Sequence, residues 1–205
     1  MATRNSTETR RRILDAAQEL VLKQGFSATS IDQILDRVGI TKGAFFYHYK
    51  TKNDLARALI DRYAQSESEL LRDFMQRAER LSKDPLQQYL IFLGLFLEMA
   101  EGMDDPFPGC LFASYCYESG LFDSETMGVI AFSMLEWRHV LSRKLEEAVA
   151  LHPPAMEFHS ESLADMLTGI FEGAFIMARA MKEPKIFAQQ LLHYKQYVEL
   201  LFHVA

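Results

Sequence analysis

The chain has 205 residues, of which 49% are hydrophobic and 24% charged, and its formal net charge is −6. This length is enough to bury a sizeable core, either as one large domain or as a small domain joined to a larger one. No run of about 18 apolar residues is free of charge, which argues against a membrane-spanning helix. The polar, basic start lacks the apolar segment of a secretory signal.

The charge is distributed unevenly along the chain. Residues 1–62 hold eleven Lys and Arg against seven Asp and Glu, a net +4, which leaves −10 for residues 63–205. The acidic total argues against a protein that coats nucleic acid, whereas a basic segment on an acidic body fits a localised contact with it. Cys110 and Cys116 lie six residues apart in an expected helix and face roughly opposite sides, so they cannot pair there. Free thiols favour a reducing, cytoplasmic location.

The first expected helix covers residues 7–24, after a basic arm at residues 1–6. Its apolar stripe is Ile13, Leu14, Ala17, Leu20 and Val21. These positions recur with a helical period, and Gly25 is expected to end the helix.

Two short helices separated by a tight turn follow. Ser30 and Gln33 form a capping box that starts a helix at Ile31, and Gly39 is placed to stop it in a left-handed conformation. Thr41 is a second N-cap, so a third helix should run from Lys42 to about residue 49. Two helices joined by about three residues with a glycine are the helix-turn-helix pattern, whose second helix can enter the major groove of DNA.

The composition of the third helix favours a DNA reader. Residues 42–52 carry three lysines, no acid and the hydrogen-bonding aromatics Tyr47, His48 and Tyr49. Gly43 and Ala44 leave room for close approach to a base edge. The alternative is an ordinary helical hairpin whose aromatic residues face a core.

The segment from Arg12 to Leu55 resembles the DNA-binding domain of TetR-family transcriptional regulators. The matching residues are Ile13, Leu14, Gly25, Phe26, Thr29, Ser30, Ile31, Ile34, Val38, Gly39, Ile40, Thr41, Lys42, Gly43, Phe45, His48, Lys52 and Leu55. The resemblance implies that Phe45 and Leu55 are core residues. The predicted DNA-binding residues are Thr29, Ser30, Thr41, Lys42, Gly43, Ala44, Phe46, Tyr47, His48 and Lys52.

The sequence departs from the family at two positions of the third helix. Phe46 stands where the family usually has Tyr, and Tyr49 where it has Phe. Because Phe46 lacks a hydroxyl for a phosphate contact, we expect Tyr47 or Tyr49 to compensate.

The remainder of the chain is also expected to be helical. Thr51 and Asp54 cap a helix that continues without a breaker and could transmit movement to the DNA-binding unit, and Pro85 suits the first turn of an apolar, central helix. The expected helices are 52–81, 85–101, 109–120, 124–151, 160–181 and 184–204. The predicted fold is therefore all-α, with a helix-turn-helix DNA-binding domain at residues 1–50 and a larger ligand-binding and dimerisation domain at residues 51–205.

The last two helices are predicted to form a homodimer. Small residues at Gly169, Gly173 and Ala174 permit close helix approach, and the final helix carries a long apolar stripe. Pairing with a second copy would give a four-helix bundle, which is also what the TetR resemblance implies. The alternative is that the same stripes form the core of a monomer.

Aromatic and methionine side chains suggest an apolar effector cavity in the second domain. The predicted ligand-binding residues are Tyr89, Phe92, Phe96, Phe107, Cys110, Tyr115, Met134, Trp137, Phe171 and Phe175. Such residues are also typical of an ordinary core. The stretch around Cys110 resembles a TetR branch that includes sensors of reactive compounds, but a cysteine is more commonly a small buried hydrophobic residue.

These features predict a ligand-responsive transcriptional repressor that binds double-stranded DNA at a palindromic operator as a homodimer and leaves it on binding a small apolar effector. We expect no enzymatic activity, cofactor or metal, because neither a catalytic constellation nor metal-ligand spacing of histidines is present in the sequence. Activation instead of repression stays open. The rival is an all-α small-molecule-binding protein or enzyme whose helix-turn-helix is vestigial.

Overall fold

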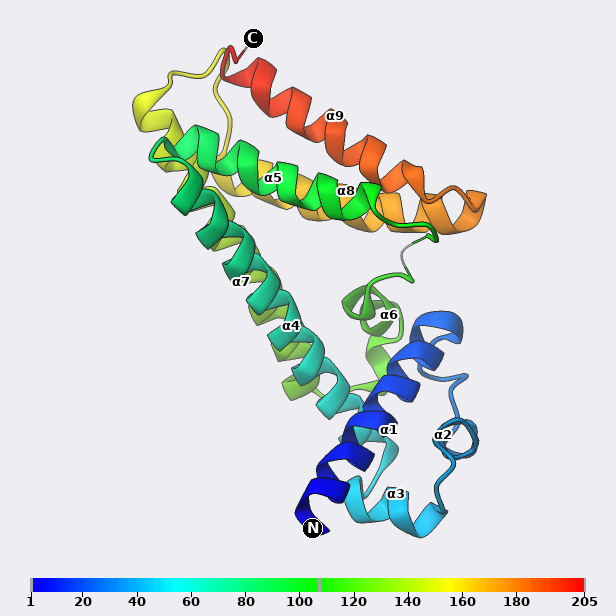
Figure 1. Cartoon of the computed structure of the whole chain (residues 1–205). Coiled ribbons are helices and arrows are strands. Elements are labelled where there is room, and N and C mark those ends of the chain that lie inside the picture. The colour runs from blue at the N-terminus through cyan, green and yellow to red at the C-terminus, as the bar shows by residue number, and fades with distance from the viewer. Residues whose placement is uncertain (1, 107, 205) are drawn as a thin grey trace. The chain divides into compact units, whose positions relative to one another are not determined.

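The computed structural model describes residues 2–106 and 108–204, and within those ranges every regular element is a helix (Figure 1). The α-helices are α1 (Ala2–Gln24), α2 (Ile31–Val38), α3 (Lys42–His48), α4 (Lys52–Leu81), α5 (Pro85–Glu101), α6 (Leu111–Tyr117), α7 (Ser124–Leu151), α8 (Ser160–Met181) and α9 (Lys185–Leu201), with a 3₁₀ turn η1 (Ser119–Leu121). The all-α prediction is confirmed. None of the described helices is long and apolar enough to cross a membrane.

Local capping sets the boundaries of the two helix-turn-helix elements. The Ser30 hydroxyl accepts a hydrogen bond from the Gln33 amide at 3.1 Å, and the Gln33 side chain accepts one from the Ser30 amide at 2.8 Å. Gly39 ends α2 with φ +71°, a left-handed conformation that glycine adopts without steric cost. The predicted start of α3 is likewise confirmed, since the Thr41 hydroxyl accepts from the Ala44 amide.

Three predicted helices have other bounds in the structure. Helix α1 begins at Ala2 rather than residue 7, because no Pro or Gly interrupts the chain there. The predicted helix 109–120 is shorter: α6 ends at Tyr117, where Glu118 leaves helical geometry and η1 follows. Helix α9 ends at Leu201, before His203 turns the backbone to φ +55°.

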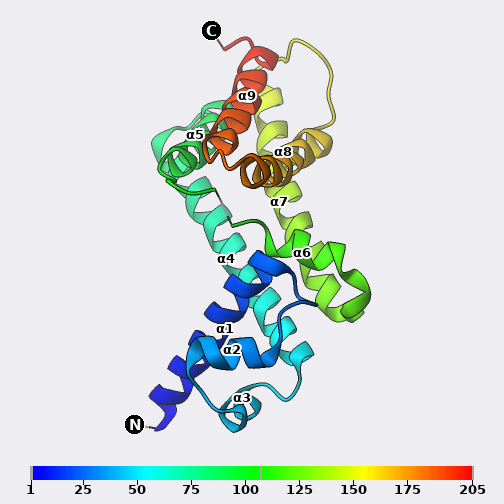
Figure 2. The ribbon, with the colours of Figure 1, turned by 90° about the vertical axis from the view of Figure 1, so that its right-hand side faces the viewer.

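The helices form two compact units. Unit 1 comprises residues 1–66 together with Cys110–Phe132. In it, α1 and α2 pack together, and α6 lies beside α1 in both views (Figures 1 and 2). Ile13, Ile34 and Phe45 are fully buried and form part of its core.

Unit 2 comprises residues 67–109 together with Ser133–Ala205. Helix α9 packs against both α5 and α8 (Figure 2), and α5 contributes eight buried residues, as expected for a helix that is apolar nearly all round. Helices α4 and α7 each contribute residues to both units. The functional boundary at residues 50 and 51 stays a prediction.

Candidate nucleic-acid interface and ligand region

Helix α3 presents a polar surface above a buried anchor. Phe45 is fully buried, whereas Lys42 and Gly43 are exposed and the Tyr47 side chain is 72% exposed. The Tyr47 ring meets the half-buried His48 ring edge-to-face, with 5.1 Å between centroids. Ala44 and Phe46 are also half-buried. The arrangement leaves the lysine and the tyrosine hydroxyl free to meet a polyanion while Phe45 fixes the helix.

The structure distinguishes the two tyrosines that could replace the hydroxyl missing at Phe46. Tyr49 is 3% exposed, and its hydroxyl is buried without a hydrogen-bond partner among the described residues. Burial raises the pKa of Tyr49, partly offset by Arg10, whose guanidinium lies 5.6 Å from the ring centroid. Of these two tyrosines, Tyr47 is therefore the one whose hydroxyl DNA could reach.

The threonines and serine at the helix starts have different surroundings. Thr29 is 1% exposed and its hydroxyl donates to the Gly25 carbonyl at 2.8 Å, so it shapes the loop before α2. Ser30 and Thr41 are exposed and cap their helices. A direct DNA contact by Thr29 stays a prediction, one that requires its hydroxyl to leave Gly25.

Lys52 makes an internal contact. Its ammonium donates to the Phe26 carbonyl at 2.6 Å and lies 4.2 Å from the centroid of the Phe26 ring. Burial lowers the pKa of Lys52, and the nearby Glu118 carboxylate partly offsets this. The predicted phosphate contact would require the ammonium to exchange the carbonyl for a phosphate oxygen.

Two side chains that shape this region, Glu118 and Arg12, are absent from the predicted DNA-binding set. Glu118 accepts hydrogen bonds from the amides of Phe26 and Ser27, more than ninety positions earlier in the chain. No local pattern signals such a pairing. Arg12 donates to the Val38 carbonyl at the end of α2, where a cation also complements the helix dipole.

Comparison with known proteins agrees with this geometry. Residues 13–59 match the family model of bacterial regulatory proteins of the tetR family, and residues 86–193 match the tetracyclin repressor-like C-terminal domain. The chain belongs to the TetR family. Because both models match, this TetR-family protein is a DNA-binding transcriptional regulator.

Individual proteins similar to this chain are also transcriptional regulators by name. The chain is 25% identical to the transcriptional regulator AcuR of Cereibacter sphaeroides over 175 residues, which cover 84% of this chain and 77% of AcuR. It is 34% identical over 80 residues to an uncharacterized HTH-type regulator of Lactococcus lactis, covering 38% of this chain and only 41% of that protein. A solved TetR regulator from Chloroflexus aurantiacus has the same fold, with a TM-score of 0.76, 24% identity and coverage of 95% and 96% of the two chains.

Most of the predicted ligand-binding residues of this regulator lie in one aromatic cluster of unit 2. Phe92, Phe96 and Phe171 are buried, with ring centroids 5.1 Å apart for the first pair and 5.3 Å for Phe96 and Phe171. The Trp137 ring packs against the Phe96 ring, with 5.7 Å between their centroids. Tyr89, Met134 and Phe175 complete the predicted set in this unit. These ring contacts bring residues from three helices, α5, α7 and α8, into one cluster.

Two other predicted ligand-binding residues, Tyr115 and Cys110, belong to unit 1. Tyr115 is fully buried in unit 1, where its hydroxyl donates to the Ala56 carbonyl at 3.0 Å and its ring stacks on Phe122 at 4.1 Å. Cys110 is a half-buried cysteine of the same unit. Phe107 lies outside the described residues. A role for these three in effector binding stays a prediction.

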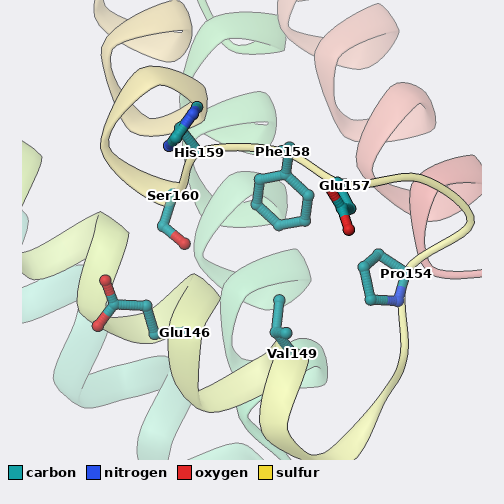
Figure 3. A pocket seen from close by; sticks show the side chains of 7 residues that line it. All are labelled: Glu146, Val149, Pro154, Glu157, Phe158, His159 and Ser160. Carbon is teal, nitrogen blue, oxygen red and sulfur yellow. The ribbon is translucent and has the colours of Figure 1, made fainter.

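A groove of about 690 Å³ opens at the end of α7 in unit 2. Its walls combine apolar side chains with two carboxylates (Figure 3). The lining residues are Glu146, Val149, Pro154, Glu157, Phe158, His159 and Ser160. None of the predicted ligand-binding residues that the structure describes lines it. Within the described ranges, no group of three His, Cys, Asp or Glu side chains could hold a metal ion.

Proposed function

We propose that this TetR-family regulator is a homodimeric repressor that binds a palindromic operator and is released by a small apolar effector. The observation that carries the proposal is the surface of α3, where Lys42 and Tyr47 are exposed above the buried Phe45. No acid occurs from Lys42 to Lys52 to repel a phosphate. A solvated surface helix would normally mix acids with its lysines.

The proposed contacts divide into two classes. Ser30, Tyr47, His48 and Lys52 bind phosphates and supply affinity for any duplex. Base recognition falls to the start of α3, where small side chains allow close approach to the groove floor. The residues of this second class are Lys42, Gly43 and Ala44, with Thr29, Thr41 and Phe46 beside them.

Dimerisation through α8 and α9 accounts for apolar side chains that one chain leaves exposed. On α8 these are Met166, Ile176, Met177 and Met181, and on α9 they are Leu192, Tyr197 and Leu200. This number of large apolar side chains exposed on two neighbouring helices favours an interaction surface there. A twofold dimer carries two α3 helices, which require an inverted repeat with half-sites about one helical turn apart or slightly more.

The proposed effector site is the aromatic cluster of unit 2. Its rings offer a face to an apolar or aromatic molecule, and Met134, one helical turn before Trp137 on α7, has a side chain flexible enough to fill gaps. A cytoplasmic location and the absence of a cofactor stay predictions from the sequence. The rival, a small-molecule-binding protein or enzyme with a vestigial helix-turn-helix, leaves the acid-free exposed surface of α3 without a purpose.

The proposal is tested by selecting duplexes from a random-sequence pool with the full-length protein, then measuring affinity and stoichiometry on the enriched duplex. We expect an inverted repeat bound by two chains. Enrichment of no duplex, or of an asymmetric site bound by a single chain, would contradict it. Screening apolar compounds for release of that duplex then tests the effector, and a Phe96→Ala variant should lose the response.

A further inference from the structure

Glu118 connects the end of α6 to the loop between α1 and α2, all within unit 1. Its Oε1 accepts from the Phe26 amide at 2.9 Å and its Oε2 from the Ser27 amide at 2.7 Å. Burial would raise the pKa of Glu118, but these backbone hydrogen bonds and the charge of Lys52 lower it overall. The carboxylate is therefore ionised at neutral pH, and both of its oxygens bind the loop.

Gly25 makes this close approach possible. It has φ +87°, a left-handed conformation, and a Cβ at this position would lie 2.6 Å from Glu118 Oε1. Any larger residue would be strained in its backbone and would also push the carboxylate away. The glycine that ends α1 thus also provides room for Glu118.

Phe26 is held from both sides. Its amide donates to Glu118, and its carbonyl accepts from Lys52 at 2.6 Å. Its ring packs against Phe122 and Tyr115, with centroids 4.9 and 5.8 Å away. The segment that carries α6 and η1 therefore fixes both the backbone and the side chain of this loop residue.

The loop leads directly into the helix-turn-helix. Three residues after Phe26, the Thr29 hydroxyl donates to the Gly25 carbonyl, and Ser30 caps α2. A movement of the loop therefore displaces the first turn of α2. Because only three residues separate α2 from α3, α3 moves with it.

We propose that Glu118 is a positioning residue for operator recognition. Its carboxylate holds the loop before α2 so that α3 meets DNA in one orientation, and any displacement of residues 110–122 is transmitted through it to the DNA-binding helices. This inference rests on the proposed function. A purely electrostatic role predicts the opposite result, because removing a negative charge near DNA strengthens binding to every duplex.

The test compares Glu118→Ala and Glu118→Gln with the control Glu125→Gln. Glu125 is a highly exposed acid of the same unit, whose carboxylate pairs with Arg57 rather than with the loop. In the full-length protein without DNA, we expect the amides of Phe26 and Ser27 to exchange about 10-fold faster in Glu118→Ala. Glu118→Gln keeps one acceptor oxygen, so the exchange rates of these amides should lie between those of the wild type and Glu118→Ala. If Glu118→Ala does not fold, the comparison is made with Glu118→Gln alone. The control should match the wild type.

The second readout is the ratio of affinities for the duplex selected by the wild type and a scrambled duplex of equal length, at two salt concentrations. We expect this ratio to fall at least about 5-fold in Glu118→Ala and to stay unchanged in Glu125→Gln. Unchanged amide exchange, or an unchanged ratio, would overturn the inference while leaving the proposed function intact. A wild-type protein that selects no duplex would instead overturn the proposed function.

Discussion

Tyr47 on α3 and Tyr49, the residue that follows the end of this helix, lie in opposite environments. Tyr47 is 72% exposed and Tyr49 is 3% exposed. The hydroxyl of Tyr47 is therefore available to a phosphate, whereas that of Tyr49 is surrounded by protein.

Replacing Tyr47 with phenylalanine should weaken binding to every duplex about 3- to 10-fold, because one phosphate hydrogen bond is worth roughly 1 kcal/mol. Tyr49→Phe serves as the matched control and should leave affinity unchanged. It should not lower the melting temperature, since it removes a buried hydroxyl that has no partner among the described residues. Fluorescence anisotropy and thermal unfolding give both results. If Tyr49→Phe weakened DNA binding and Tyr47→Phe did not, the phosphate contact would belong to Tyr49.

Lys52 gives a second prediction at this scale. Its ammonium bonds to the Phe26 carbonyl in the structure, and a phosphate contact would replace that bond. Lys52→Ala should lower affinity for selected and scrambled duplexes alike, and reduce the slope of log K against log salt by about 1. The measurement is a salt titration from about 50 to 200 mM. Lys83→Ala, which removes an exposed lysine of unit 2, should keep the wild-type slope; equal slopes for both variants would rule out the phosphate contact.

At the scale of elements, the helix boundaries were predictable wherever the signal is local. Ser30 with Gln33, Gly39 and Thr41 act on residues within five positions of themselves, so a single sequence contains the whole interaction. Thr51 and Asp54 likewise exchange hydrogen bonds at the start of α4.

Placement across the chain was less predictable. Residue type alone suggests Tyr115 as a ligand-binding residue, and it does not indicate that the ring stacks on Phe122 in unit 1. Helix α6 ends at the residue before Glu118, whose carboxylate accepts hydrogen bonds from the loop before α2. The periodicity of apolar residues carries no information about a contact between segments so far apart in the chain. Long-range contacts depend on how helices pack, and periodicity fixes only which face of a helix is apolar.

The start of α5 yields a prediction of pH dependence. Asp84 Oδ1 accepts from the Gln87 amide at 2.9 Å, and Oδ2 pairs with His152. Burial would raise the pKa of Asp84, but these hydrogen bonds lower it overall. A carboxyl whose pKa is depressed in the folded state stabilises the protein above its unfolded pKa, and this contribution disappears as pH falls through the folded value.

Asp84→Ala should therefore reduce the free energy of unfolding by about 1 kcal/mol near neutral pH, the usual value of an N-cap. The difference from wild type should begin to shrink below about pH 4, where an aspartate of the unfolded chain becomes protonated, and should disappear as pH falls through the lower pKa of the native carboxyl. Chemical denaturation across this pH range measures it. Asp105→Ala removes an exposed carboxylate from the loop after α5 and should cost little at any pH. A loss in Asp84→Ala that persists undiminished at acid pH would show that the cap works through shape rather than charge.

At the scale of the whole molecule, α8 has a feature that one chain does not explain. Gly169 and Gly173 lie four residues apart in the middle of a helix, where glycine costs about 1 kcal/mol relative to alanine. A Cβ at either position would meet nothing within 4 Å. Packing within the chain therefore gives no reason for the absence of a side chain, whereas the close approach of a second helix does.

The test is to fill this space. In a twofold interface each substitution acts twice, and overpacking costs about 1–3 kcal/mol per site. Gly173→Leu should therefore raise the dimer dissociation constant by about 30-fold or more while leaving the helical content of the chain intact. Gly128→Leu makes the same change at an exposed glycine of α7 that also has no neighbour within 4 Å, and should remain as dimeric as wild type. Sedimentation equilibrium measures both constants.

The same variant also tests how dimerisation affects DNA binding. Because two linked α3 helices are needed to span an inverted repeat, Gly173→Leu should lose affinity for the selected duplex in proportion to its loss of dimer. If leucine at position 173 left the dimer unaffected, the interface would lie on another face.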